Sequence, residues 1–267
     1  MSDPIDSTTI VDVTDVDPAL DTFTCLVTAE SRLREAQRDR VLGNDLTEFE
    51  RNYFGPEVGA VRRAYNRTMM KHMQTGGRLL DFGCGGVWWK QDYWPSFSEV
   101  TACEVDRSAL KEIGAAYPAV RLWWTRNGLI GTEESFDVVL SSSVLGYILP
   151  EQARHHIACA YRLLGEGGQL VLTRVLAYDL AAWLRGRRLV DLPGPRFAYH
   201  YSKAELVRVL RDVGFRDIRY HTLGARLPGL SWRINQALYK AAPPLMTQAF
   251  PAMFPFFKVQ HMLTARK

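Results

Sequence analysis

The segment Leu79–Gly86 constrains the fold of this 267-residue chain more than any other part of its sequence. An apolar run ends in Asp81, and a glycine-rich turn of Gly83, Cys84 and Gly85 follows almost at once. Parallel sheets build nucleotide-type pockets from a buried strand, a glycine turn and then a helix. The segment therefore predicts an α/β fold with a ligand site at the carboxyl edge of a parallel sheet.

The residues around the turn indicate which ligand binds there. A dinucleotide pocket uses a further glycine so that the helix N-terminus can approach a pyrophosphate, but Val87, Trp88 and Trp89 follow this turn. Asp81 would also repel an anion and attract a cationic amine. Both features favour a ligand that carries a positive group beside its sugar, such as S-adenosylmethionine.

A second acid lies at the end of the next apolar run. The segment Val100–Asp106 predicts a strand that ends at Glu104, with Val105 directly after it. A carboxylate in this place can accept hydrogen bonds from both ribose hydroxyls. The alternative is a solvated residue at a strand end, and the offset from Asp81 favours the ribose role.

Three later segments continue the alternation of strands and helices. Val120–Trp124 predicts a third strand, Phe136–Ser141 a fourth, and Tyr161–Leu172 a helix, a turn and a fifth strand. In this order the segments resemble the class I S-adenosylmethionine-dependent methyltransferases of the small-molecule type, over about residues 56 to 225. Val87 departs from the family, because many members have another glycine there. The resemblance implies a three-layer Rossmann-like sheet that is mostly parallel with an antiparallel last strand and helices on both faces.

The resemblance also implies site residues. The expected cofactor-binding set is Asp81, Gly83, Cys84, Gly85, Glu104, Val105, Asn127 and Ser141, with Asn127 placed to meet the adenine amine. His200 and Tyr147 are the expected catalytic residues, and Tyr53, Tyr147 and Tyr201 the expected substrate-binding residues; no metal ligand is expected. Packing at a helix start remains the alternative for Tyr147, and a structural histidine the alternative for His200.

The expected chemistry needs few catalytic groups. S-Adenosylmethionine carries an activated methyl group, so the protein must chiefly align a nucleophile and exclude water. His200, with an ordinary pKa of about 6.5, could accept a proton from a hydroxyl or amine. The adjacent pair His155 and His156 is expected to be solvated at the polar edge of a helix.

Composition limits the class of protein. With 47% apolar residues the chain can bury one sizeable core. The net charge of +4 is mild, and no dense basic block indicates nucleic-acid binding. No apolar run approaches the roughly 20 residues of a membrane span, and no signal peptide is evident, so we expect a cytoplasmic protein, a monomer or homodimer. The cysteines Cys25, Cys84, Cys103 and Cys159 lack paired spacing and are expected to be reduced core thiols.

The chain divides into an N-terminal extension or cover, residues 1–55, and a methyltransferase domain, residues 56–267. The acidic first 21 residues lack basic neighbours and are expected to be loosely held. A helix is expected from Pro56 to Gly76, a helix capped by Ser202 ends at Gly214, and residues 217–223 and 257–264 predict the last strands. An aromatic, proline-rich insertion at about 226–256 is expected to cover the substrate pocket as a lid.

These features favour methylation of a small organic acceptor on oxygen, nitrogen or carbon, as in natural-product biosynthesis. Serines 141–143 replace the "NPPY" signature of amide and adenine methylation, and they provide no acid for a magnesium ion. The main alternative is a lipid-like acceptor at a membrane surface, which the amphipathic insertion would contact. A non-catalytic binding protein with this fold and a nicotinamide-dependent reductase on a similar sheet are weaker hypotheses, because the pair of acids at Asp81 and Glu104 opposes both.

Overall fold

The computed structural model describes residues 9–15, 59–87, 89–148, 150–175, 189–192, 196–199, 201–225, 232–253 and 259–267. Its centre is an eight-stranded sheet with the order β1-β4-β3-β2-β5-β6-β10-β9. The strands of this sheet are β1 (Ile10–Asp12), β2 (Arg78–Phe82), β3 (Glu99–Glu104), β4 (Arg121–Trp124), β5 (Phe136–Ser142), β6 (Leu164–Val175), β9 (Arg216–Ala225) and β10 (Val259–Arg266). Only β10 runs antiparallel to its neighbours, β6 and β9. The predicted Rossmann-like sheet is therefore confirmed.

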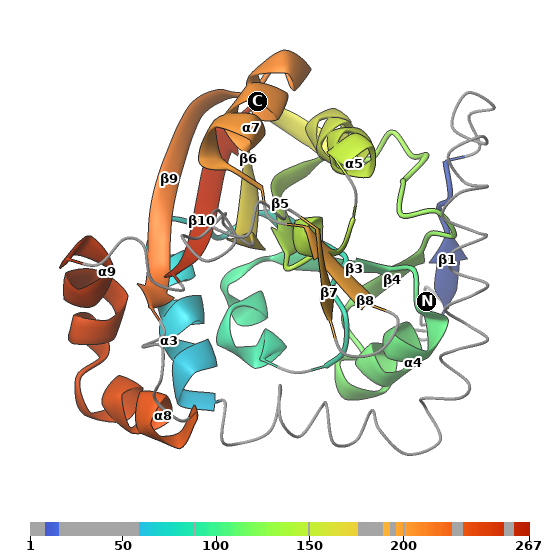
Figure 1. Ribbon diagram of the computed structural model, residues 1–267. Helices are drawn as coiled ribbons and strands as arrows, with labels where there is room; N and C mark the ends of the chain where they lie inside the picture. Colours follow the sequence, from blue (N-terminus) through green and yellow to red (C-terminus); the bar gives the residue numbers. More distant parts are fainter. Residues whose placement is uncertain are drawn as a thin grey trace.

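Helices cover both faces of the sheet (Figure 1). The first face carries α3 (Gly59–Met70), α4 (Arg107–Ala116) and α8 (Trp232–Ala241), whose apolar side chains share one buried cluster. The second face carries α5 (Pro150–Leu163) and α7 (Lys203–Val213), which contribute to the other cluster. A separate hairpin consists of β7 (Leu189–Leu192) and β8 (Arg196–Tyr199).

Strand β2 shows how the sequence places an acid in this core. Successive side chains of a strand point to opposite faces, and Leu80 and Phe82 accordingly pack with α5 and α7. Leu79 packs on the other face, in the cluster of α3 and α4. Asp81 shares the face of Leu79, so its carboxylate points toward the segment that follows the glycine turn.

Helix α7 begins and ends as the sequence predicts. The Ser202 side chain accepts a hydrogen bond from the Glu205 backbone N–H, and the Glu205 side chain accepts one from the Ser202 N–H. Gly214 ends the helix with φ 114°, in the left-handed region that glycine tolerates best. Leu206 and Leu210 bury the apolar face of the helix.

Two local expectations are wrong. The first concerns the segment after the glycine turn: its described residues form two 3-10 segments, Lys90–Asp92 and Trp94–Ser96, that lead into β3, and no α-helix. Trp89 has a positive φ of 69°, and Pro95 lacks the N–H that a continuing helix would need. The rings of Tyr93 and Trp94 are instead buried in the core.

The second concerns the acidic N-terminal segment, whose described part is not loosely held. Strand β1 pairs in parallel with β4 at the edge of the sheet, and Thr14 forms a bridge with Ile130. Asp15 accepts an ion-paired hydrogen bond of 2.8 Å from Arg162 of α5. Arg162 could not be predicted as the partner of Asp15 from local sequence, because it lies far along the chain.

The described part of the insertion packs on the domain body. After α8, a π-helical turn (Leu245–Ala249) and α9 (Phe250–Met253) lie against β9. Tyr239 of α8 is buried and donates a 2.7 Å hydrogen bond to the carbonyl of Ala225. Within the described residues, no helix combines the length and apolar character needed to cross a bilayer.

Candidate functional site

The glycine turn lies at the carboxyl ends of β2, β3 and β5. The Gly83 and Cys84 N–H groups donate to the Cys103 carbonyl, at 2.8 and 3.0 Å, and tie the turn to β3. A Cβ at Gly83 would lie 2.3 Å from a methyl carbon of Val144, whereas a Cβ at Gly85 would have no neighbour within 4 Å. The turn is therefore packed against the loop after β5 and open at Gly85.

Glu104 faces this open side from the end of β3. Its Oε2 accepts a 2.7 Å hydrogen bond from the Gly85 N–H, and its Oε1 accepts one of 2.8 Å from the Val105 N–H. Burial raises the pKa of the Glu104 carboxyl, and the backbone donors oppose that change. A backbone hydrogen bond from Asp106 also reaches this carboxylate, which has about four acceptor sites in all, so it retains capacity for a ligand hydroxyl.

Val105 provides an apolar surface beside that carboxylate. The residue is 52% exposed, which is unusual among the large apolar residues of the described chain. The Val105 carbonyl accepts a 2.9 Å hydrogen bond from the Trp124 indole, and the Arg107 guanidinium lies 3.9 Å from the Trp124 ring centroid. The backbone at Val105 is thus fixed while the side chain stays available for a flat ligand.

The sequence pattern suggested that Asp81 is exposed at the end of a strand. Instead, its side chain is 0% exposed. One oxygen, Oδ2, accepts hydrogen bonds from Lys90 Nζ (2.8 Å), the Tyr93 hydroxyl (2.8 Å) and the Trp94 indole (3.0 Å). The cation beside Asp81 is therefore a lysine of the chain and not, as expected, an amine of the ligand. The second oxygen, Oδ1, is buried with no hydrogen-bond partner among the described residues.

Lys90 is held by the same group of residues. Besides Asp81, its ammonium donates to the Cys84 carbonyl at 2.6 Å and to the Tyr93 hydroxyl at 3.0 Å. Burial alone would lower the pKa of Lys90, but the charge of Asp81 raises it above its usual range. The Lys90 side chain is therefore an ammonium ion at neutral pH.

Three of the four cysteines lie in the described residues: Cys84, Cys103 and Cys159 are buried and free, as predicted. Burial raises the pKa of the Cys84 thiol well above its ordinary value. Cys84 therefore contributes its backbone to the turn rather than a thiolate, and Cys25 lies outside the described residues.

Ser141 and His156 form a buried pair behind the turn. The Ser141 hydroxyl lies 2.9 Å from His156 Nε2, and the imidazole stacks on Phe82 with ring centroids 4.0 Å apart. Burial lowers the pKa of His156 to about 4, so the ring is neutral at pH 7. The expectation that His156 is solvated is wrong, and the hydroxyl of Ser141 is engaged by a side chain rather than directed at a ligand.

Asn127 shapes the turn after β4. Its Oδ1 accepts hydrogen bonds from the Thr125 hydroxyl and the Leu129 N–H, both at 3.1 Å, and its amide nitrogen donates to the Asp15 carbonyl. An amide oxygen has two lone pairs. The single hydrogen of the Thr125 hydroxyl has a closer acceptor in the Leu129 carbonyl, so Asn127 Oδ1 keeps acceptor capacity and its contact with the adenine amine stays a prediction.

The predicted acceptor-side residues are only partly described. Tyr201 is buried, and its hydroxyl donates a 2.8 Å hydrogen bond to the Ile148 carbonyl, so its ring supports the loop after β5. The backbone of Tyr147 belongs to the 3-10 segment Leu145–Tyr147, next to the turn-packing residue Val144. The Tyr147 side chain, Tyr53 and His200 lie outside the described residues.

Sequence reasoning missed Lys90, Tyr93 and Trp94 as the partners of Asp81. The available signal was a single lysine in the strongly aromatic stretch from Val87 to Phe97. A charged residue surrounded by aromatic residues indicates a buried partner of opposite charge. Within the described ranges, no group of three or more His, Cys, Asp or Glu side chains could hold a metal ion.

Comparisons with known proteins agree with this geometry. A family model described as a methyltransferase domain matches residues 51–220, more than half of the chain. A Burkholderia thailandensis 1,6-didemethyltoxoflavin N1-methyltransferase is similar in structure, with a TM-score of 0.56, 17% identity and coverage of 97% of this chain and 94% of that one. No curated protein matches by sequence.

Two further solved structures share the fold. A methyltransferase from Archaeoglobus fulgidus has a TM-score of 0.55 at 14% identity, covering 84% of this chain and 100% of that one. One from Methanosarcina mazei has a TM-score of 0.52 at 18% identity, covering 75% and 96%. The sheet order, the glycine turn and the family match lead to one conclusion: this chain belongs to the methyltransferase-domain family and is a class I S-adenosylmethionine-dependent methyltransferase.

Proposed function

We propose that the carboxyl edge of β2, β3 and β5 binds S-adenosylmethionine and that the enzyme methylates a small organic acceptor. The observation that carries this proposal is the Glu104 carboxylate, fixed beside the open face of Gly85. Backbone N–H groups of Gly85, Val105 and Asp106 orient its oxygens, and the carboxylate keeps acceptor capacity. This arrangement suits the vicinal hydroxyls of a ribose.

Neighbouring residues fit the rest of the cofactor. The exposed Val105 side chain offers an apolar surface to the adenine ring. The absence of a side chain at Gly85 lets the ligand approach the backbone of the turn. The unpartnered Oδ1 of Asp81 is a buried acceptor, and such atoms in native proteins ordinarily bind a partner.

The residues of the chain supply position rather than covalent chemistry. S-Adenosylmethionine, when bound, supplies a methyl group already activated on a sulfonium. Glu104 fixes the nucleoside, and the loop after β5, packed on Gly83 through Val144, sets the side from which an acceptor approaches. Alignment of two reactants of this kind can contribute about 7–11 kcal/mol of barrier reduction. His200 and Tyr147 remain our candidates for proton removal and acceptor contact.

A small acceptor is supported by the relative that covers nearly the whole chain. That enzyme is a 1,6-didemethyltoxoflavin N1-methyltransferase, and it was crystallised with 1,6-didemethyltoxoflavin and S-adenosylhomocysteine. We extend the class, a small organic molecule, to this chain, and not the compound itself. The segment Leu245–Met253 of the insertion packs on β9, while Ile234, Leu245 and Met253 keep exposed apolar surface that an acceptor or a membrane could contact.

Binding of S-adenosylhomocysteine, measured by isothermal titration calorimetry, tests the cofactor site. The wild-type protein should bind it, and Glu104→Gln should weaken binding about tenfold to a hundredfold, because hydrogen bonds to a charged acceptor are lost or weakened. The matched control Glu112→Gln, on the exposed side of α4, should bind like the wild type. No heat from the wild-type protein would contradict the proposal.

A methyl-transfer assay tests the acceptor class. Labelled cofactor would be offered with a panel of small heteroaromatic amines and phenols, and in parallel with phospholipid vesicles. Label in a soluble product supports the proposal. Label confined to the vesicle fraction would contradict it and favour a lipid-like acceptor.

A further inference from the structure

We propose that Lys90 is a positioning residue that fills the cation-binding place of the glycine turn with the chain's own ammonium. As a result, the amino-acid end of the cofactor binds without forming an ion pair with Asp81. This inference rests on the proposed function, and it concerns how the same site distinguishes ligands with and without an α-amino group.

The hydrogen bonds of Lys90 use all of its donors. An ammonium has three N–H donors, and Lys90 directs them to three acceptors: Asp81 Oδ2, the Cys84 carbonyl and the Tyr93 hydroxyl. Two of these acceptors belong to the turn and the strand before it, where a ligand ammonium would be expected. Lys90 therefore has no donor left for a ligand carboxylate, and it occupies two acceptors that a ligand amine would need.

The charge of Asp81 is also compensated. The Lys90 and Asp81 side chains are 6% and 0% exposed, and they form a pair with a net charge of zero. The one carboxylate oxygen of that pair without a hydrogen-bond partner among the described residues is the buried Oδ1, the acceptor left for a ligand ammonium. There it meets an acceptor whose negative charge is already balanced, so it gains a hydrogen bond but little net Coulomb attraction.

Lys90 is, moreover, held in place by its neighbours in the chain. Asp92 accepts a 3.1 Å hydrogen bond from Asn66 of α3, and Gln91 accepts one of 3.2 Å from the Tyr117 hydroxyl after α4. These contacts attach the 3-10 segment to two helices. Displacing the lysine would leave the Asp81 carboxylate buried without its cation, which is costly. The ligand thus binds with Lys90 in place.

Calorimetry on the wild-type protein tests the inference directly. S-Adenosylhomocysteine would be compared with the analogue in which hydrogen replaces the α-amino group. We expect the loss of the amino group to weaken binding by about tenfold or less, the worth of one ordinary hydrogen bond. A larger loss would overturn the inference. If S-adenosylhomocysteine itself did not bind, the proposed function would fail instead.

A variant gives the complementary test. Lys90→Met keeps the length of the side chain and removes the charge, so the ligand ammonium would become the nearest cation to Asp81. In this variant the penalty for the missing amino group should rise by about tenfold or more, because the remaining bond is to an uncompensated charge. The exposed control Lys111→Met should keep the wild-type ratio.

The readout is the ratio of the affinities for S-adenosylhomocysteine and for the analogue without the amino group. General loss of structure would weaken both affinities and leave their ratio unchanged. Circular dichroism would first establish that Lys90→Met folds, and if it does not, the wild-type comparison decides alone. An unchanged ratio in a folded Lys90→Met protein would overturn the inference.

Discussion

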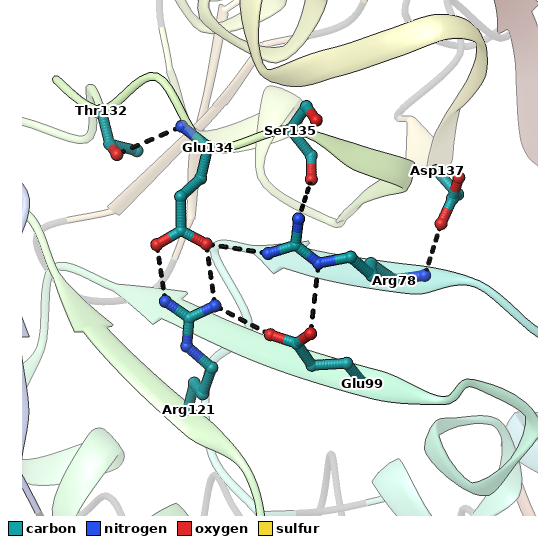
Figure 2. Close-up of polar contacts among 7 residues, drawn as sticks. All are labelled: Arg78, Glu99, Arg121, Thr132, Glu134, Ser135 and Asp137. Atoms are coloured by element: carbon teal, nitrogen blue, oxygen red, sulfur yellow. Dashed lines mark hydrogen bonds and ion pairs between the residues drawn. The ribbon is translucent and has the colours of Figure 1, made fainter.

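The charged side chains at the amino ends of the parallel strands are paired differently from those at the carboxyl ends. At the amino ends of β2–β5, Arg78 and Arg121 form four ion pairs with Glu99 and Glu134, at 2.6–3.2 Å (Figure 2). These side chains are 35–40% exposed. At the carboxyl ends, one buried ion pair lies beside the partly open carboxylate of Glu104. The same strands thus carry a network of partly exposed ion pairs at their amino ends. At their carboxyl ends they carry a buried ion pair and a carboxylate with room for a further hydrogen bond.

This difference distinguishes the end of the sheet where ion pairs hold the strands together from the end where we propose that a ligand binds. Each carboxylate at the amino ends meets two guanidinium groups, and hydrogen bonds from Arg121 lower the pKa of both Glu99 and Glu134. Arg78 also donates to the Ser135 carbonyl, and its backbone N–H donates to Asp137 (Figure 2). At the carboxyl ends, Asp81 Oδ1 has no partner among the described residues. This unpartnered carboxylate oxygen lies at the end of the strands where we propose that the ligand binds.

Removal of Asp81 should have the largest effect on stability. Asp81→Ala leaves the Lys90 ammonium buried without its counter-ion, which should lower the free energy of unfolding by about 3–5 kcal/mol. Urea denaturation measures this change. The double variant Asp81→Ala/Lys90→Met should recover part of the loss, because no unpaired charge remains. A loss no larger for Asp81→Ala than for Glu134→Ala, at the exposed end, would show that the buried pair is not special.

The buried His156 should make stability depend on pH. Burial lowers the pKa of His156 to about 4 in the folded protein, whereas its ordinary pKa in the unfolded chain is about 6.5. At a pH below 6.5 the unfolded chain therefore binds a proton at this residue more readily than the folded protein does. Stability is therefore complete above pH 6.5 and falls as the pH falls toward 4. Between pH 7 and 5 the loss from this residue should be about 2 kcal/mol.

Thermal or urea unfolding at several pH values checks this expectation. His156→Gln should reduce the slope, while His155→Gln, at the partly exposed neighbour, should keep it. A smaller slope will remain in His156→Gln, because burial also lowers the pKa of His261 to about 4. If the two variants showed equal slopes, His156 would not be the source.

Arg121→Gln should have the smallest effect. Partly exposed ion pairs contribute about 1 kcal/mol or less, even with good geometry, and salt should reduce the contribution further. Urea denaturation at low and high salt measures it. Binding of S-adenosylhomocysteine should not change, since the network lies at the opposite end of the strands. Weakened binding would show that the two ends are coupled.

Much of the fold could be predicted from the sequence because its signals are local. Apolar runs predicted β2–β6, and the side chains of Ser202 and Glu205 identified the start of α7. The missing helix after the glycine turn could not be predicted, because it depends on where the rings of Tyr93 and Trp94 find space. Local patterns do not record that packing.

The site was harder to predict than the fold. An acid at a strand end looks the same in sequence whether it is exposed or buried, so a ligand cation was expected at Asp81 where the chain provides Lys90. The burial of His156 could have been predicted: it lies three residues after Ala153 and four before Ala160, both buried, and so shares their helix face. The expectation was wrong because it placed His156 at the polar edge of the helix instead of on the face of these alanines.

Strand β1 has a consequence for anyone who shortens this protein. It covers the backbone of β4, which would otherwise be the outermost strand of the sheet. A variant lacking residues 9–15 would expose unpaired N–H and carbonyl groups of β4. Exposed edges of this kind favour strand pairing between molecules, so we expect self-association. The short N-terminal strand therefore occupies hydrogen-bonding groups of β4 with which a strand of a second molecule could otherwise pair.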